Sequence, residues 1–403
     1  MSTSLLYHGF GVRGYEYVRT EYVGGQVLFT IRQPRQALRC SACGSRAVRP
    51  HGAAERHFRT VPIGPKAVLV KFAVPRVCCQ GCGVTRQVAI DFADPRRTYT
   101  KAFERYALEL SRHMTIRDVA RHLGVSWDVI KDIQKRDLSR RYAKPKLKGL
   151  RRIAIDEIAV AKGHRYLTVV MDLDTGAVVF VGDGKGGDAL KPFWKRLRRC
   201  KAKIEAVAMD MSAAYRQAVS THLKGAAIVF DHFHVIKLFN DKLSGLRRSL
   251  YHRADAAGKK VLKGARWLLL KAPENLDDDR NEAARLGEAL RLNKPLAVAY
   301  YLKEDLRQFW DQPGKRFAGA FLRDWVRRAE ASGVKMLQQM ARTLTAHSAG
   351  LLAYYDHPIS TGPLEGTNNK IKTLKRQAYG FRDQEFFKLK ILAIHEARYA
   401  LVG

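Results

Sequence analysis

Four acidic residues, far apart in the sequence, have the type and setting that metal-dependent chemistry requires. Asp156 interrupts the apolar run of Arg151–Asp174, and Asp210 and Asp231 each end a short apolar run. Glu365 stands far downstream, in the first turn of a predicted basic helix. A carboxylate among strand-forming residues is costly unless it stays solvated, finds a partner or binds a cation. The pattern predicts carboxylates that converge around a divalent cation, which would offset their mutual repulsion.

Alternative interpretations of these acids remain open at the level of sequence. Asp156 could be a turn residue, with the neighbouring Glu157 carrying the function. Asp210 could only cap the following helix, which would leave Asp231 as the metal ligand. Asp231 and His234 could hydrogen-bond each other and brace the sheet instead of acting in catalysis. Three further acids are more typical of turns than of ligands, namely Asp172, Asp174 and Asp183.

The segment around Glu365 combines an acid with a basic surface. Pro363 suits the first position of a helix, and a carboxylate in the first turn is stabilised by the helix dipole. The same helix carries cations that would contact phosphates: Lys370, Lys372, Lys375 and Arg376. Alternatively, Glu365 could form a surface ion pair with Lys372.

Two Cys-x-x-Cys-Gly motifs predict a second metal site. Cys40 and Cys43 form one motif, and Cys79 and Cys82 form the other. The two-residue gap lets both thiolates reach one ion, and four thiolates suit tetrahedral, structural Zn²⁺. Cys78 could replace Cys79, and two histidines, His51 and His57, could replace a thiolate. The alternative to a zinc site is a set of reduced, partly buried thiols, as we expect for Cys200.

The elements before residue 150 form two predicted domains. Residues 1–97 contain alternating strand patterns, including a hairpin around Gly24-Gly25, and form a β-rich zinc-binding domain. Residues 98–149 form a helix-turn-helix domain and a basic linker. In it Thr115 and Ser126 cap two short helices and Gly124 separates them. We expect the second helix to present Trp127, Lys131, Gln134 and Lys135 to DNA.

The remaining elements predict an α/β domain with a helical insertion. Two strands joined at Asp174-Thr175-Gly176 are followed by strands that end at Asp210 and Asp231, which indicates a mixed sheet with helices on its faces. In a ribonuclease-H-like sheet the first and fourth strands are parallel neighbours, which would bring Asp156 and Asp210 together. We assign the first part of this domain to residues 150–240, an all-α insertion to 241–355 and the last part to 356–403.

The charge of the chain points to a polyanionic partner. Its 403 residues include 73 Lys and Arg against 38 Asp and Glu, a net charge of +35. Nucleic acid fits best, because each neutralised phosphate releases counterions. In the insertion, three tryptophans could stack on unpaired bases, although such residues more often belong to the core: Trp267, Trp310 and Trp325. No apolar run is long enough to cross a membrane, so we expect a cytoplasmic protein without a membrane partner.

These motifs, in this order, resemble those of bacterial insertion-sequence DDE transposases. The matching stretches are IDE, KGHRYLTVVMDLDTG, AMDMS, FDHFHVIKL and GPLEGTNNKIKTLKRQAYGFRD, and the zinc-binding and helix-turn-helix segments point to the ISL-three family. The resemblance covers the chain from about Cys40 to its end. It implies a catalytic triad of Asp156, Asp210 and Glu365, with Asp231 and His234 matching a D-x-x-H signature.

The resemblance also implies the reaction and its partners. Two Mg²⁺ ions, or Mn²⁺ in their place, would assist DNA strand cleavage and strand transfer. The protein would bind the terminal inverted repeats of its element and the target DNA as a homodimer or larger assembly, and would associate with the bacterial nucleoid. Two alternatives remain: a non-catalytic, transposase-derived DNA-binding repressor, and a structure-selective nuclease.

Overall fold

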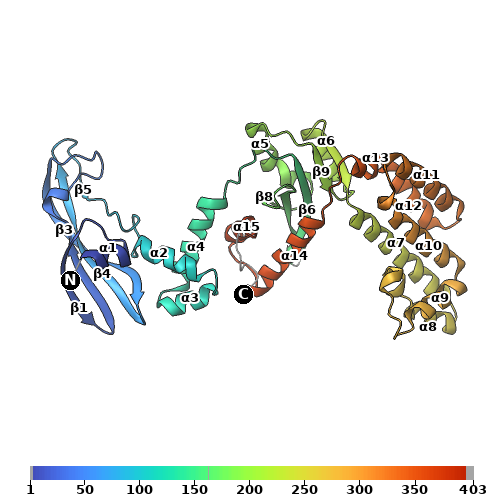
Figure 1. Cartoon of the computed structure of the whole chain (residues 1–403), viewed down its shortest axis with the longest axis horizontal. Coiled ribbons are helices and arrows are strands. Elements are labelled where there is room, and N and C mark those ends of the chain that lie inside the picture. Colours follow the sequence, from blue (N-terminus) through green and yellow to red (C-terminus); the bar gives the residue numbers. More distant parts are fainter. Residues whose placement is uncertain (1–2, 162, 396–403) are drawn as a thin grey trace. The chain divides into compact units, whose positions relative to one another are not determined.

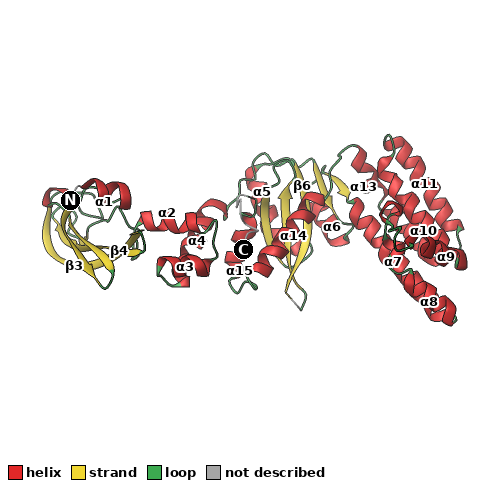
Figure 2. Ribbon diagram, turned by 60° about the horizontal axis from the view of Figure 1, so that its bottom comes forward, coloured by secondary structure: helices red, strands yellow, loops and turns green. Residues whose placement is uncertain are grey.

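The computed structural model describes residues 3–161 and 163–395, and these divide into two compact units, 3–143 and 144–395. Each unit contains a five-stranded sheet (Figures 1 and 2). No helix in the described residues is long and apolar enough to span a membrane.

The first unit begins with helix α1 (Thr3–Phe10) and a sheet in the order β1-β2-β4-β3. The strands are β1 (Glu16–Val23), β2 (Gln26–Arg32), β3 (Val48–Ile63) and β4 (Lys66–Cys79), and the short β5 (Thr85–Gln87) pairs with β4. The predicted hairpin joins β1 and β2. Gly24 and Gly25 both have positive φ, as a tight hairpin turn requires. The core of this part includes Phe58 and Phe72, which are fully buried.

Three helices complete the first unit, and their caps are those that the sequence predicts. They are α2 (Lys101–Leu110), α3 (Ile116–Leu123) and α4 (Trp127–Tyr142). The side chains of Thr115 and Ser126 accept hydrogen bonds from backbone amides in the first turns of α3 and α4. Gly124 ends α3 in the left-handed conformation. A separate apolar cluster holds the three helices together, so the helix-turn-helix has its own core.

The second unit is built on the sheet β10-β9-β6-β7-β8. Its strands are β6 (Arg152–Ala161), β7 (Arg165–Asp172), β8 (Val178–Asp183), β9 (Ala206–Met209) and β10 (Ala227–Phe230). β6 is parallel to β9, and β9 is parallel to β10, whereas β7 and β8 are antiparallel to their neighbours. The first and fourth strands are therefore parallel neighbours, which confirms the predicted ribonuclease-H-like arrangement.

Helices cover both faces of this sheet. Ile153 and Ile155 of β6 belong to the same apolar cluster as residues of α5 (Lys191–Cys200) and α6 (Ala213–His222). Ala154 and Ile158 belong to the cluster of α14 (Gly362–Gln377) and α15 (Gln384–Leu392). Because side chains alternate along a strand, Asp156 lies on the face covered by α14.

The predicted all-α insertion lies between β10 and α14. Its helices are α7 (His232–Arg253), α8 (Ala256–Gly264), α9 (Glu282–Leu292), α10 (Lys294–Arg307), α11 (Lys315–Ala331), α12 (Lys335–Ala346) and α13 (Ser348–Leu352). Their apolar side chains continue the cluster on the α5 and α6 face of the sheet. The insertion thus shares a core with the sheet, and this core fixes where α7 leaves β10 and where the chain returns to α14.

Candidate active site and metal centre

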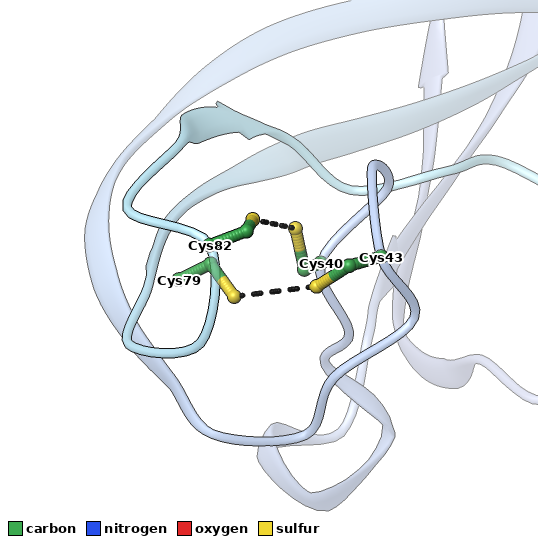
Figure 3. Close-up of side chains that lie close together, drawn as sticks. All are labelled: Cys40, Cys43, Cys79 and Cys82. Atoms are coloured by element: carbon green, nitrogen blue, oxygen red, sulfur yellow. Dashed lines mark hydrogen bonds between the residues drawn. The ribbon is translucent and has the colours of Figure 1, made fainter.

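The four motif cysteines converge at one end of the β3–β4 hairpin (Figure 3). The Sγ atoms of Cys40 and Cys82 lie 3.7 Å apart, and those of Cys43 and Cys79 lie 3.6 Å apart. Four sulfurs at a Zn–S distance of about 2.3 Å form a tetrahedron with edges of about 3.8 Å. The cysteine group therefore fits a zinc ion without rearrangement.

Successive side chains of β4 point to opposite faces, and this decides whether Cys78 or Cys79 joins the zinc-binding group. Cys79 is buried and belongs to the group, whereas Cys78 faces the other side of the strand. A backbone hydrogen bond from Cys82, opposed by burial, lowers the pKa of Cys79 to about 6. Such N–H donors favour thiolates, which are the form that binds zinc. His51 and His57 are not part of the cluster.

The side chains of α4 that we expected to face DNA differ in their exposure. Trp127 is 46% exposed, and the Lys131 ammonium lies 5.4 Å from the centre of its ring. Lys135 is half-buried. The expectation that Gln134 faces DNA is wrong, because this side chain is buried and its Oε1 finds no hydrogen-bond partner among the described residues. Gln134 follows Ile130 by four positions, so helical geometry turns it toward the same core.

Asp156 is the centre of the candidate active site. Its Oδ2 accepts a hydrogen bond of 2.8 Å from Nδ2 of Asn368 on α14. Burial raises the pKa of Asp156, the Glu157 amide and the nearby His234 lower it, and the Asp210 carboxylate raises it again. The charges of Asp210, which follows β9, and of His234, in the first turn of α7, therefore both act on Asp156.

Glu157 points to the opposite face of β6. Its carboxylate accepts a hydrogen bond of 3.1 Å from the hydroxyl of Tyr215 on α6. That hydroxyl also lies 3.0 Å from Thr168 Oγ1 and accepts from the Gly186 amide. Glu157 is thus held in a polar network away from Asn368, which favours Asp156 as the functional member of the pair.

Asp210 follows β9 directly, and one of its two oxygens is used locally. Its Oδ1 accepts a hydrogen bond of 3.0 Å from the Ser212 amide, ahead of α6 (Ala213–His222). The local bond resembles the capping role that we considered from the sequence. The charge of the same carboxylate also acts on Asp156 and raises its pKa.

Asp231 has a different environment. Its side chain is almost fully buried, and both oxygens accept backbone amides. One comes from Phe233 in the first turn of α7, at 3.1 Å, and the other from Thr361, just ahead of α14, at 3.0 Å. Asp231 therefore ties β10 and α7 to the start of α14. Its hydrogen bonds go to these amides and not to His234.

Glu365 is placed by the helix that carries Asn368. Residues three apart share one face of a helix, so Glu365 lies one turn before the contact between Asn368 and Asp156. Lys372 donates to Asn369 rather than to Glu365. The cations expected to contact phosphates continue along the helix, with Lys372 and Arg376 exposed and Lys370 and Lys375 half-buried.

Carboxylate oxygens such as those of Asp156, Asp210 and Glu365 are suitable ligands for Mg²⁺ or Mn²⁺. Among the described residues, only the cysteines form a group of three or more His, Cys, Asp or Glu whose ligand atoms all lie within 4.8 Å of one another. The carboxylates are thus spaced more widely than the thiolates. A pair of ions about 3.5–4 Å apart accepts ligands on its outer sides, so opposite ligands need not touch.

The three tryptophans of the insertion differ in their surroundings. Trp325 belongs to the core, and its Nε1 donates to the Leu302 carbonyl at 2.7 Å. Trp325 is therefore not available to stack on an unpaired base, and the core interpretation holds for it. Trp310 is half-buried beside His232. Trp267 is 63% exposed, with the Arg266 guanidinium 4.5 Å from its ring centre.

Sequence reasoning missed the role of Thr361, whose backbone amide carries the contact to Asp231. A backbone amide is present at every residue except proline, so the residue type at this position gives no signal of the contact. Of the acids expected in turns, Asp172 and Asp174 lie at the β7–β8 turn, where Asp172 accepts from the Asp174 amide and the Thr175 hydroxyl. Asp183 instead is the last residue of β8 and pairs with Lys388.

Comparison with known protein families agrees with this architecture. Residues 153–391 match the ISL3 DDE family described as "Transposase". The chain belongs to the ISL3 transposase family. Residues 88–137 match the helix-turn-helix domain of transposase family ISL3. Residues 36–82 match the zinc-finger of transposase IS204/IS1001/IS1096/IS1165. The predicted DNA-binding helix-turn-helix, structural zinc site and DDE domain are confirmed as features of this transposase.

Two relatives align with this transposase over nearly its whole length. The transposase for insertion sequence element IS1001 of Bordetella parapertussis is 32% identical over 96% of this chain and 95% of its own. The transposase for insertion sequence element IS1557 of Mycobacterium tuberculosis is 30% identical, and the alignment covers 94% of this chain and 91% of that protein. The Drosophila P element transposase strand transfer complex matches with a TM-score of 0.37, which is too low to establish a common fold.

Proposed function

We propose that this transposase binds the terminal inverted repeats of its own element, cuts DNA strands there and joins the new 3′-hydroxyls to target DNA. The observation that carries the proposal is the contact between Asn368 and Asp156. This contact joins the helix that carries Glu365 to the strand that carries Asp156, and the charges of Asp210 and His234 act on the same carboxylate. These observations support a site formed by acids from three remote segments next to a basic helix surface.

The residues would divide the work as follows. Asp156, Asp210 and Glu365 hold two Mg²⁺ ions, with Mn²⁺ as a substitute. When bound, such ions supply activation of the attacking oxygen and stabilisation of the leaving oxygen at phosphorus. His234, whose charge acts on Asp156, is the catalytic candidate of the D-x-x-H signature. Asp231 acts by positioning α14, because both of its oxygens already accept backbone amides.

DNA is recognised by surfaces outside the carboxylate group. The zinc-binding segment and α4, with Trp127, Lys131 and Lys135, read the element ends in the major groove. Lys370, Lys372, Lys375 and Arg376 contact phosphates near the reacting strand. Because two ends must be paired before joining, we expect a dimer or larger assembly on DNA, acting at the bacterial nucleoid.

The test is cleavage of DNA that contains candidate element ends, with Mg²⁺ and mapping of the new 3′-hydroxyls. Wild-type protein should cut at the ends. Glu365→Gln should reduce cutting by orders of magnitude while DNA affinity is kept, because the substitution removes a ligand and leaves the helix intact. Glu385→Gln is the matched control, since Glu385 is a first-turn acid of the neighbouring helix α15.

Other outcomes would replace the proposal. Equal cutting of scrambled ends would indicate a structure-selective nuclease. Specific binding without any cutting by the wild-type protein would indicate a repressor. Metal-dependent nicking that survives in Glu365→Gln would eliminate the assignment of the site.

A further inference from the structure

A groove of about 610 Å³ lies between the outer end of β6 and the C-terminal half of α14. Its floor is apolar and includes Ile158, Val160 and Ile371. Figures 1 and 2 both show α14 lying beside β6. The groove belongs to the same strand and helix that carry Asp156 and Glu365, but it lies beyond them along both elements.

The charged side chains that line the groove are all cations. They are Lys372, Lys375 and Arg376, and no carboxylate is among the lining residues. Three cations side by side repel one another unless an anion lies between them. A phosphate-bearing chain on an apolar floor matches both the charge and the surface of this groove.

Tyr379 stands at the end of the groove in an unusual conformation. Its side chain is fully exposed to solvent, and its φ is +50°, in the left-handed region that bulky side chains rarely adopt. A glycine at this position would cost less, and an exposed ring adds no packing to the core. A strained and exposed aromatic residue is therefore a sign of function more than of stability.

The turn that holds Tyr379 is anchored on both sides. The amides of Tyr379 and Gly380 donate to the last carbonyls of α14, those of Arg376 and Lys375. Phe381 then stacks on Phe387 of α15, with ring centres 4.6 Å apart. The ring of Tyr379 is thus presented on a fixed base rather than on a loose loop.

The spacing relates this ring to the carboxylates. Gln377, the last residue of α14, follows Glu365 by twelve positions. This is about 18 Å at the helical rise of about 1.5 Å per residue, and Tyr379 stands two residues further along the chain. At about 3.4 Å per nucleotide, the helical span is about five nucleotides of a stacked strand. A strand that starts at the carboxylates and follows α14 would pass the three cations before it reaches Tyr379.

We propose that this groove binds a DNA strand leading away from the cleavage site and that Tyr379 stacks on an unpaired base of that strand. The inference rests on the proposed function, because DNA bound at the carboxylates supplies the strand. A base offers a flat surface to the ring, and the cations contact its flanking phosphates.

The experiment measures binding of the full-length transposase, without added Mg²⁺, to a short duplex with a few unpaired adenines and to the same duplex fully paired. The wild-type protein should prefer the unpaired DNA. Tyr379→Ala should reduce that preference by about 5- to 150-fold, the range expected for the loss of one aromatic stack. Tyr379→Phe should keep it. With 2-aminopurine in place of one unpaired adenine, the wild type and Tyr379→Phe should quench its fluorescence, and Tyr379→Ala should not.

An unchanged preference in Tyr379→Ala, or an equal loss for both DNAs, would overturn the proposal. Tyr379→Gly is a second variant that fits the backbone conformation, so it should fold and show the same loss. Because no cleavage is measured, the result is independent of the Glu365→Gln test. A failure of the proposed chemistry and a failure of the stacking model would therefore be distinguishable.

Discussion

Replacing Asp231 with asparagine tests whether this acid positions α14 or binds a cation. Its two oxygens accept the amides of Phe233 and Thr361 in an almost fully buried setting. Asparagine has one carbonyl oxygen, so one amide would face an NH₂ group instead of an acceptor.

The expected cost follows from these two contacts. A buried donor without a partner costs about 1–3 kcal/mol, and the remaining bond loses its charge assistance, worth about 1 kcal/mol. Asp231→Asn should therefore lower the unfolding free energy of the second unit by roughly 2–4 kcal/mol, a large part of a typical domain stability. Cleavage should fall as well, because the contact from Thr361 fixes the start of the helix that bears Glu365.

Urea unfolding followed by tryptophan fluorescence provides the assay, since four of the five tryptophans lie in the second unit. Asp255→Asn is the matched control. Asp255 caps α8 through one exposed bond to Gly258, and asparagine caps helices as well as aspartate does. Its effect should be close to zero. The reasoning is refuted if Asp231→Asn unfolds like the wild type but binds Mn²⁺ more weakly, because Asp231 would then be a ligand.

Three further predictions concern the zinc site, the buried acid and the recognition helix. Cys79→Ser should no longer bind one zinc ion per chain, because one of the four thiolates is removed. Cys78→Ser should retain the zinc ion. Metal analysis of the two purified proteins measures the difference. Burial raises the folded-state pKa of Asp156, so its ionisation costs folding free energy. The stability of the metal-free protein should thus fall as pH rises from the ordinary aspartate range through the raised pKa, and the penalty should persist at neutral pH. Asp156→Asn should accordingly be more stable than the wild type near pH 7 while it abolishes cleavage; a lower melting temperature would contradict this. Gln134→Leu should stabilise the first unit by about 1 kcal/mol, because a buried oxygen without a partner is removed, and binding to duplex DNA should stay unchanged. A loss of DNA affinity would restore Gln134 as a contact.

The sequence by itself determined the local features of this transposase. The Cys-x-x-Cys spacing, the caps at Thr115 and Ser126 and the glycines of the first hairpin act within a few residues, so their effects can be derived from neighbouring letters. The strand patterns also predicted a mixed sheet, and the ribonuclease-H-like fold then predicted that the strand of Asp156 and the strand that ends at Asp210 are parallel neighbours. The motif resemblance then supplied the family.

Tertiary structure decided the choices among chemically similar groups. Because side chains alternate along β4, Cys79 and not Cys78 joins the zinc-binding group. Asp156 and Glu157 point to opposite faces of their sheet, so only Asp156 of the pair contacts Asn368. The packing of α4 buried Gln134, although its polarity suggested exposure. Asp231 meets an amide 130 positions away, and Tyr379 stands exposed at a left-handed turn. These outcomes depend on contacts between distant segments, whose free energies are settled only when the whole core forms.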